Sequence, residues 1–125
     1  MKNKSNLIGQ IGEDITAKYL KTKGFVITAK NYHSRFGEID VIAENNELIL
    51  FVEVKTRCAN SIASPAEFVD RRKQQKIIAT ARLFIYNNSV ALQPRFDVAE
   101  IITAKSGDFS DVKINYIENA FGDDG

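Results

Sequence analysis

The chain of 125 residues contains a single cysteine, a single histidine and no tryptophan. With only Cys58 available, an intramolecular disulfide is excluded, and a reducing compartment is expected. His33 alone cannot build a histidine-type zinc site, and we interpret it as a loop residue. No apolar run approaches the roughly 18 residues of a membrane span, and residues 1–6 are polar. We therefore expect a cytoplasmic protein with neither a membrane segment nor a signal peptide.

The composition indicates one soluble domain, and the charge is distributed unevenly along it. Hydrophobic residues make up 44% of the chain and charged residues 26%, which is typical of one soluble domain. We expect this domain to span residues 1–125, with a core over 5–117 and a frayed tail over 118–125. The net charge is +1, but residues 1–30 and 57–82 each carry six basic and two acidic residues. Such basic segments suit a protein that binds a phosphate backbone, although an ordinary surface is the more frequent explanation.

The most informative stretch is a predicted hairpin over residues 37–55. Aliphatic and β-branched residues alternate on both sides of Asn45-Asn46, which predicts two strands joined by a two-residue turn. In that register Asp40 pairs with Phe51, and Asp40 and Glu53 become diagonal neighbours with Cα atoms roughly 7–8 Å apart. Lys55 follows on the same face, because side chains alternate along a strand.

Acids that share a half-buried sheet face require an explanation. One interpretation is a solvated face on which Lys55 neutralises a neighbouring acid, and this is the commonest origin of such a pattern. A second is a structural cation site. The third is a metal-assisted hydrolase, in which Mg²⁺ on oxygen ligands activates a water and Lys55 positions this water or stabilises negative charge. The spacing of Asp40, Glu53 and Lys55 alone does not decide between them.

Four separated segments carry a resemblance to known proteins: Ile8-Gly9-Gln10-Ile11-Gly12-Glu13, Arg35-Phe36-Gly37-Glu38-Ile39-Asp40-Val41-Ile42-Ala43, Phe51-Val52-Glu53-Val54-Lys55-Thr56-Arg57 and Arg95-Phe96-Asp97-Val98. A helix, a hairpin with Asp and Glu-x-Lys, and a second helix resemble the PD-(D/E)XK nuclease superfamily and its restriction-endonuclease-like fold. More narrowly, the four segments resemble the YraN family of small bacterial proteins, which are considered similar to Holliday-junction resolvases. The resemblance covers about residues 9–101.

The resemblance assigns roles by position. It implies that Asp40, Glu53 and the backbone carbonyl of Val54 hold Mg²⁺ or Mn²⁺, and that Lys55 is the catalytic lysine. Glu13 matches an acid that many relatives bring to the same cation from a helix. From the residues alone, Glu13 has small or apolar neighbours on its helix side. A first-turn acid favoured by the helix dipole is an equal alternative.

The second predicted helix, about Phe68 to Tyr86, adds polar candidates. Gln74 falls near the centre of its apolar stripe, where a glutamine is unusual, and Lys73 lies at the edge. The resemblance implies a polar residue from this helix in the active site, whereas the alternative for Gln74 is a side chain that turns to solvent. The candidates for nucleic-acid contacts are Arg35, Arg57, Lys73, Gln74 and Lys76. As an alternative, each arginine pairs with a nearby acid.

These observations predict an α/β (α+β) domain with a central mixed β-sheet flanked by helices. The expected elements are a helix from Ser5 as N-cap to Lys23 with Gly24 after it, strands at Phe25–Asn31, Arg95–Thr103 and Val112–Ile117, the hairpin, and the second helix. The resemblance implies a Mg²⁺- or Mn²⁺-dependent nuclease with branched or end-bearing substrates, and it favours DNA over RNA as the nucleic acid. The alternatives are a nucleic-acid-binding module that is inactive without a partner, and a purely structural protein. A homodimer is left open.

Overall fold

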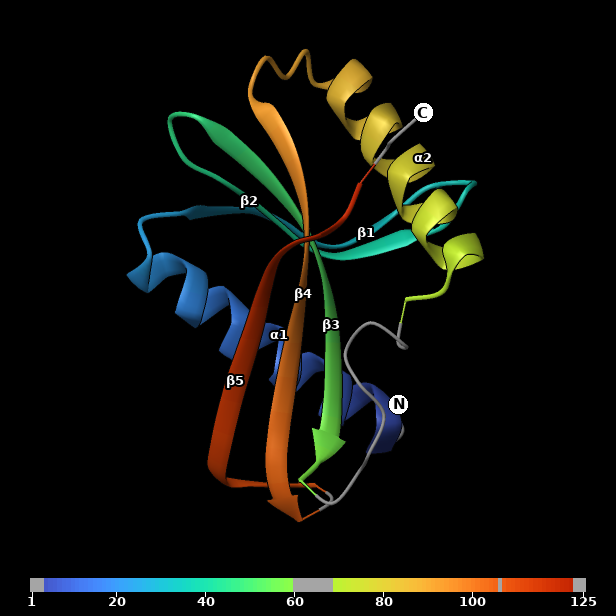
Figure 1. Cartoon of the computed structure of the whole chain (residues 1–125). Coiled ribbons are helices and arrows are strands. Elements are labelled where there is room, and N and C mark those ends of the chain that lie inside the picture. Colours follow the sequence, from blue (N-terminus) through green and yellow to red (C-terminus); the bar gives the residue numbers. More distant parts are fainter. Residues whose placement is uncertain (1–3, 60–68, 106, 123–125) are drawn as a thin grey trace.

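The computed structural model describes residues 4–59, 69–105 and 107–122. The elements are α1 (Lys4–Thr22), β1 (Val26–His33), β2 (Glu38–Glu44), β3 (Leu48–Cys58), α2 (Arg71–Asn87), β4 (Gln93–Lys105) and β5 (Asp108–Phe121). The strands form one sheet in the order β1-β2-β3-β4-β5, in which only β3 and β4 are parallel (Figure 1). The prediction of a mixed sheet flanked by helices, consistent with a restriction-endonuclease-like arrangement, is confirmed. In the described part of the chain, no helix has the length and hydropathy needed to cross a membrane.

The two helices cover opposite faces of the sheet, and each face has its own hydrophobic core. The α2 core contains Ile39, Ile42, Ile49, Phe51, Val69, Ile77, Ile78, Ala81, Phe84, Phe96 and Val98. The α1 core contains Leu20, Val41, Ala43, Leu50, Val52 and Ala99. Alternate residues of β3 thus enter opposite cores. Because β3 is buried on both faces, its sequence is a nearly continuous apolar run.

The two ends of α1 differ in how well they match the prediction. Gly24 has φ +91°, and the N–H of Phe25 donates to the carbonyl of Leu20 at 3.0 Å. This is the C-terminal cap that a glycine in the left-handed region permits, so the predicted end is confirmed. The helix begins at Lys4, however, and Ser5 lies inside it, so Ser5 as N-cap is wrong.

The start of α2 also differs from the prediction. The helix begins at Arg71, and Asp70 is its N-cap, with a side-chain oxygen that accepts a hydrogen bond of 2.8 Å from the N–H of Lys73. An aspartate at this position satisfies a backbone N–H that has no partner within the helix. The predicted first residue, Phe68, lies outside the described residues.

The hairpin between β2 and β3 has another register than the predicted one. Glu44 faces Ile49, so the loop has four residues instead of two. Asn45 holds this loop, since its Oδ1 accepts hydrogen bonds from the N–H groups of Glu47 and Leu48 at 2.8 and 2.7 Å. The shift of two residues leaves each side chain on its predicted face. When the pairing of Val41 with Val52 is continued by one residue, Asp40 lies directly opposite Glu53 instead of diagonal to it.

The last strand is longer than expected. β5 runs to Phe121, so the predicted end at Ile117 and the fraying of residues 118–121 are wrong. The ring of Phe121 stacks on Phe96 with centroids 5.3 Å apart, which holds the end of the strand against the core. Residues 123–125 of the predicted tail lie outside the described residues. His33, expected in a loop, is the last residue of β1.

Candidate active site

One polar pocket brings together residues that lie far apart in the sequence. It has a volume of about 300 Å³ and is lined by Ile8, Gly9, Glu13, Asp40, Glu53, Val54, Lys55, Thr56 and Lys73. These residues come from α1, β2, β3 and α2. All the predicted catalytic and metal residues therefore line the same pocket, and Lys73, predicted as a nucleic-acid contact, lies there with them.

Asp40 and Glu53 form the acidic centre of this pocket. Glu53 is 4% exposed, and Oδ2 of Asp40 accepts a hydrogen bond of 2.8 Å from the N–H of Val54. Burial and the negative charge of Glu53 raise the pKa of Asp40 to about 8. Because the charge of Glu53 opposes the ionisation of Asp40, a cation is favoured between the two side chains.

Two lysines neutralise one of these acids. Nζ of Lys73 lies 2.5 Å and Nζ of Lys55 3.6 Å from Oε2 of Glu53. Burial alone would lower the pKa of Lys73, but the hydrogen bond and the charge of Glu53 outweigh burial and raise it. Lys73 therefore lies within the pocket as the closest positive partner of a buried carboxylate.

Glu13 reaches the pocket wall from α1 but has another partner. It is 9% exposed, and its Oε1 accepts a hydrogen bond of 2.8 Å from Nδ2 of Asn31 on β1. Burial raises the pKa of Glu13 in spite of this hydrogen bond. Since α1 begins at Lys4, Glu13 lies well inside the helix, and the first-turn alternative is wrong.

The donors in the pocket fit a hard divalent cation only in part. Over residues 4–59, 69–105 and 107–122, no group of three or more His, Cys, Asp or Glu side chains is arranged to hold a metal ion. Glu13, the third acid expected at the cation, lines the same pocket and bonds to Asn31 through one of its two carboxylate oxygens. The side chains of Asp40 and Glu53 and the carbonyl of Val54 are oxygen donors of the kind that Mg²⁺ and Mn²⁺ bind.

The other predicted nucleic-acid contacts lie around the pocket. Lys76 is exposed and lines a second pocket of about 320 Å³ together with Gly37, Glu38, Asp70, Arg72, Lys73 and Ile77. Arg35 is exposed at the tip of the β1–β2 hairpin. Gln74 donates from Nε2 to the carbonyl of Val69 at 2.8 Å, so its amide serves the start of α2. Nε of Arg57 lies 3.5 Å from Oε2 of Glu100, which agrees with the alternative of pairing with an acid.

Glu100 is a residue of the site region that the sequence reasoning missed. It is 5% exposed, lies opposite Lys55 in the β3–β4 register and accepts a hydrogen bond of 3.1 Å from Nδ2 of Asn115. In the sequence, Glu100 could have been recognised as an acid among the apolar residues of β4. Arg72, which lines the second pocket, was also missed, because it lies on the polar side of the helix pattern.

Comparison with known proteins identifies a group of close relatives. A model of the family described as "Uncharacterised protein family UPF0102" matches residues 12–101. A UPF0102 protein of Dictyoglomus thermophilum is 43% identical over 122 residues, which cover 97% of this chain and all of that protein. The UPF0102 protein TTE1452 of Caldanaerobacter subterraneus is 44% identical over 91% of this chain and 93% of its own length. The UPF0102 protein CLJ_B2665 of Clostridium botulinum is 41% identical over the same shares of the two chains.

Proposed function

The chain belongs to the UPF0102 (YraN) family, and on this premise we propose that it is a divalent-metal-dependent nuclease that cleaves phosphodiester bonds in DNA. The observation that carries the proposal is the apposition of Asp40 and Glu53 in a pocket that also contains Lys55 and Lys73. Two acids that face each other, one of them buried, destabilise a fold unless positive charge accompanies them. The acids can hold a cation and the lysines can bind an anion, and this combination suits a negatively charged phosphodiester substrate.

In this proposal each residue has a role that follows from its position. Asp40, Glu53 and the carbonyl of Val54 would hold Mg²⁺ or Mn²⁺. The bound cation would supply Lewis acidity toward a phosphate oxygen and lower the pKa of a water. Lys55 would orient the attacking water or stabilise the negative charge that develops on the phosphate. Glu13 would add a carboxylate from α1 to the same cation.

The surrounding cations would bind the DNA backbone. Arg35, Arg57, Lys73 and Lys76 are the proposed phosphate contacts, Gln74 supports the start of α2, and Arg72 extends the set. Binding through phosphates should weaken with salt, with a slope in log K of about −0.9 for each contact on duplex DNA.

One observation favours the alternative of an inactive binding module. Glu53 already has two lysine partners, which a cation would have to displace or share.

The first prediction separates the enzyme from the binding module. Lys55→Ala should reduce DNA cleavage by about 10²–10³-fold, the usual scale for one lost electrostatic stabiliser, and should leave Mn²⁺ binding intact. Asp40→Asn should lose both. Cleavage is measured on linear duplex, single-stranded, nicked and four-way-junction DNA, and metal binding by the shift in melting temperature. Bound Mn²⁺ should stabilise the wild type by about 2.7 kcal/mol at 100 times Kd.

Glu44→Gln is the matched control, because Glu44 belongs to the same hairpin but bonds to Thr28 outside the pocket. It should change neither cleavage nor the Mn²⁺ shift. Equal cleavage by the wild type and Lys55→Ala on every substrate would show that the lysine is not catalytic. A wild-type melting temperature that does not respond to Mn²⁺ would contradict the metal site.

A further inference from the structure

The tip of the β1–β2 hairpin, residues 34–37, presents an aromatic ring and a cation together. Phe36 is 40% exposed, and the guanidinium of Arg35 lies over its ring, 4.7 Å from the centroid. Neither hydrophobic core of the described residues includes Phe36. An aromatic ring that serves no core and carries a cation at its face is suited to stack on a nucleobase.

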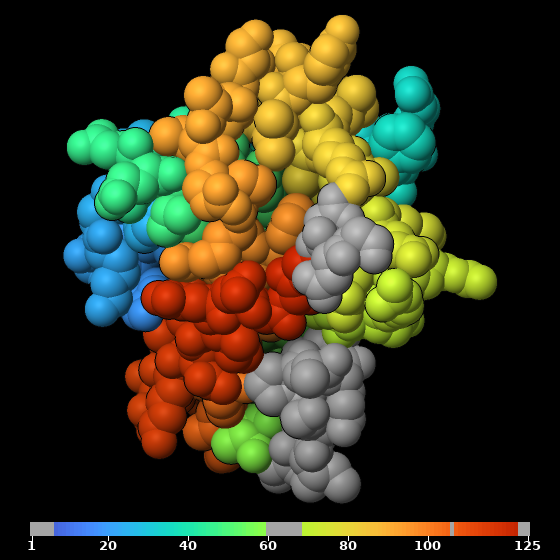
Figure 2. All heavy atoms as spheres, turned by 45° about the horizontal axis from the view of Figure 1, so that its top comes forward, coloured from blue at the N-terminus to red at the C-terminus, as the bar shows by residue number. Residues whose placement is uncertain are grey.

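The chain holds this tip rigidly. The N–H of Ser34 donates to the carbonyl of Gly37 at 2.8 Å, and the N–H of Phe36 donates to Oγ of Ser34 at 3.0 Å. Oγ of Ser34 lies 2.9 Å from Oγ1 of Thr80, which is fully buried on α2. Figure 2 shows the cyan tip projecting from the surface beside α2. A ring on a braced support loses little conformational entropy when it binds a ligand.

The tip also adjoins the candidate active site through a line of cations. Gly37 lines the second pocket with Arg72, Lys73 and Lys76, and Lys73 also lines the pocket of the two acids. Phe36 precedes Asp40 by four residues, a chain span of at most about 14 Å. That span corresponds to about four stacked nucleotides at roughly 3.4 Å each. A strand bound at the acids can therefore pass the lysines of α2 and reach the ring.

We propose that Phe36 and Arg35 form a stacking site for an unpaired base of DNA, within about four nucleotides of the phosphate at the active site. The inference rests on the proposed function, since it takes DNA as the ligand. Bases inside an intact duplex stack on each other and must be unstacked before they can meet a side chain. The preferred DNA is therefore one with a single-stranded end or a junction close to the cleaved bond.

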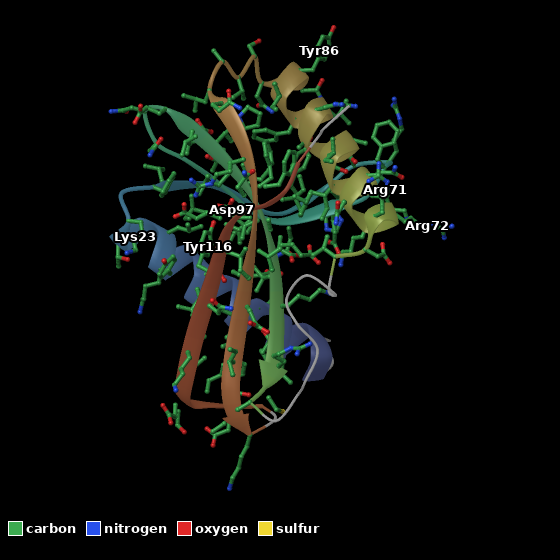
Figure 3. The ribbon with its side chains drawn as sticks, in the orientation of Figure 1. Lys23, Arg71, Arg72, Tyr86, Asp97 and Tyr116 are labelled. Atoms are coloured by element: carbon green, nitrogen blue, oxygen red, sulfur yellow. The ribbon has the colours of Figure 1, made fainter. Side chains whose placement is uncertain are left out.

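A single introduced tryptophan tests the stacking directly. The chain has no tryptophan, so Phe36→Trp places the only indole at the hairpin tip. Tyr86→Trp is the matched control, because Tyr86 is 82% exposed and lies at the opposite end of α2 from Arg71 and Arg72 (Figure 3). Each variant is titrated, without divalent metal, with a duplex that has a single-stranded overhang and with the blunt duplex of the same sequence. The overhang duplex should quench the emission of Phe36→Trp and leave that of Tyr86→Trp unchanged.

The second part of the test compares the affinities of the wild type and Phe36→Ala for the two duplexes. Phe36→Ala should weaken binding of the overhang duplex by about 5- to 150-fold, the range for one lost base–aromatic stack, and should leave the blunt duplex and the melting temperature unchanged. Unchanged emission of Phe36→Trp on DNA that binds, or equal weakening of both duplexes by Phe36→Ala, would overturn the stacking site and leave the proposed nuclease intact. If the wild type binds neither duplex at low salt, both proposals fail.

Discussion

Asp40 is a carboxyl group whose ionised form is stabilised only in part by its neighbours. The N–H of Val54 favours the ionised carboxylate, but burial and Glu53 outweigh that hydrogen bond and raise the pKa to about 8. The ion pairs of Lys55 and Lys73 are made with Glu53, at 3.6 and 2.5 Å. A cation that binds both acids would compete with the proton on Asp40, which couples metal binding to pH.

At this scale we predict that the stability of the metal-free protein falls as pH rises from about 4 to about 8. An unfolded aspartic acid ionises near its ordinary pKa of 3.8, whereas folded Asp40 keeps its proton up to about pH 8. Between these values the folded state binds more protons, so the free energy of unfolding decreases with pH, by at most about 1.4 kcal/mol per pH unit. Asp40→Asn should flatten the melting temperature between about pH 5 and pH 8.

Asp111→Asn is the control for this pH profile, because Asp111 is exposed on β5 and does not line the pocket. It should keep the slope of the wild type. Equal slopes for the wild type and Asp40→Asn would assign the titration to another group.

At the scale of elements, α1 approaches the sheet through a glycine. A Cβ atom on Gly12 would come within 2.5 Å of Oγ1 of Thr56 and 3.3 Å of Cγ1 of Val54, both on β3. A Cβ atom on Gly9, one turn earlier, would meet nothing within 4 Å. Since Gly12 directly precedes Glu13, this close contact sets how deeply α1 brings Glu13 into the pocket wall.

The two glycines should therefore respond to alanine in opposite directions. Gly12→Ala should destabilise the protein by about 1–3 kcal/mol, because the added methyl group overpacks the contact with β3. Gly9→Ala should stabilise it by about 0.5–1 kcal/mol, because alanine favours the helical conformation. Urea unfolding measures both. Thr56→Ala should recover part of the loss when combined with Gly12→Ala, and shifts in the same direction for both glycines would contradict this packing of α1.

At the scale of the whole molecule, one buried network joins β4, β5 and α1. Asp97 is fully buried and accepts hydrogen bonds from Arg95 at 2.9 Å, the hydroxyl of Tyr116 at 2.6 Å and the N–H of Asn119 at 2.9 Å. Burial and the charge of Asp97 raise the pKa of Tyr116, which keeps the hydroxyl a donor. The ring of Tyr116 lies 5.2 Å from that of Tyr19 on α1. Asp97 and Tyr116 lie together near the middle of the molecule (Figure 3). The segment 95–98 thus holds β4, β5 and α1 together through Asp97 and its partners.

Removing the centre of this network should have a large effect. Asp97→Ala should destabilise the protein by about 3–5 kcal/mol, because it leaves the guanidinium of Arg95 without its buried partner. Glu118→Ala is the control on the same arginine, with an exposed carboxylate 3.6 Å from Nη1, and should lose at most about 1 kcal/mol. Urea unfolding compares the two. A loss for Asp97→Ala no larger than that for Glu118→Ala would show that the network does not hold β5.

Local sequence patterns were sufficient to place the acids and the lysine of the hairpin on one face of the sheet and to end α1. Alternation along a strand is a property of neighbouring residues, so it placed Asp40, Glu53 and Lys55 on one face even though the predicted register was wrong by two residues. Gly24 ended α1 for an equally local reason, its freedom to adopt positive φ. Motif segments spread over the chain identified the family before any contact was known.

Contacts between distant segments decided the rest. The side chain of Asn45 lengthened the hairpin loop, the end of β5 was held by Phe96 and Asp97, and Glu13 was bonded to Asn31. Lys73 lies on Glu53 because the crossover between β3 and β4 brings the first turn of α2 over the pocket. Periodicity specifies the face on which a side chain lies, but the partner that it meets depends on how elements pack in three dimensions.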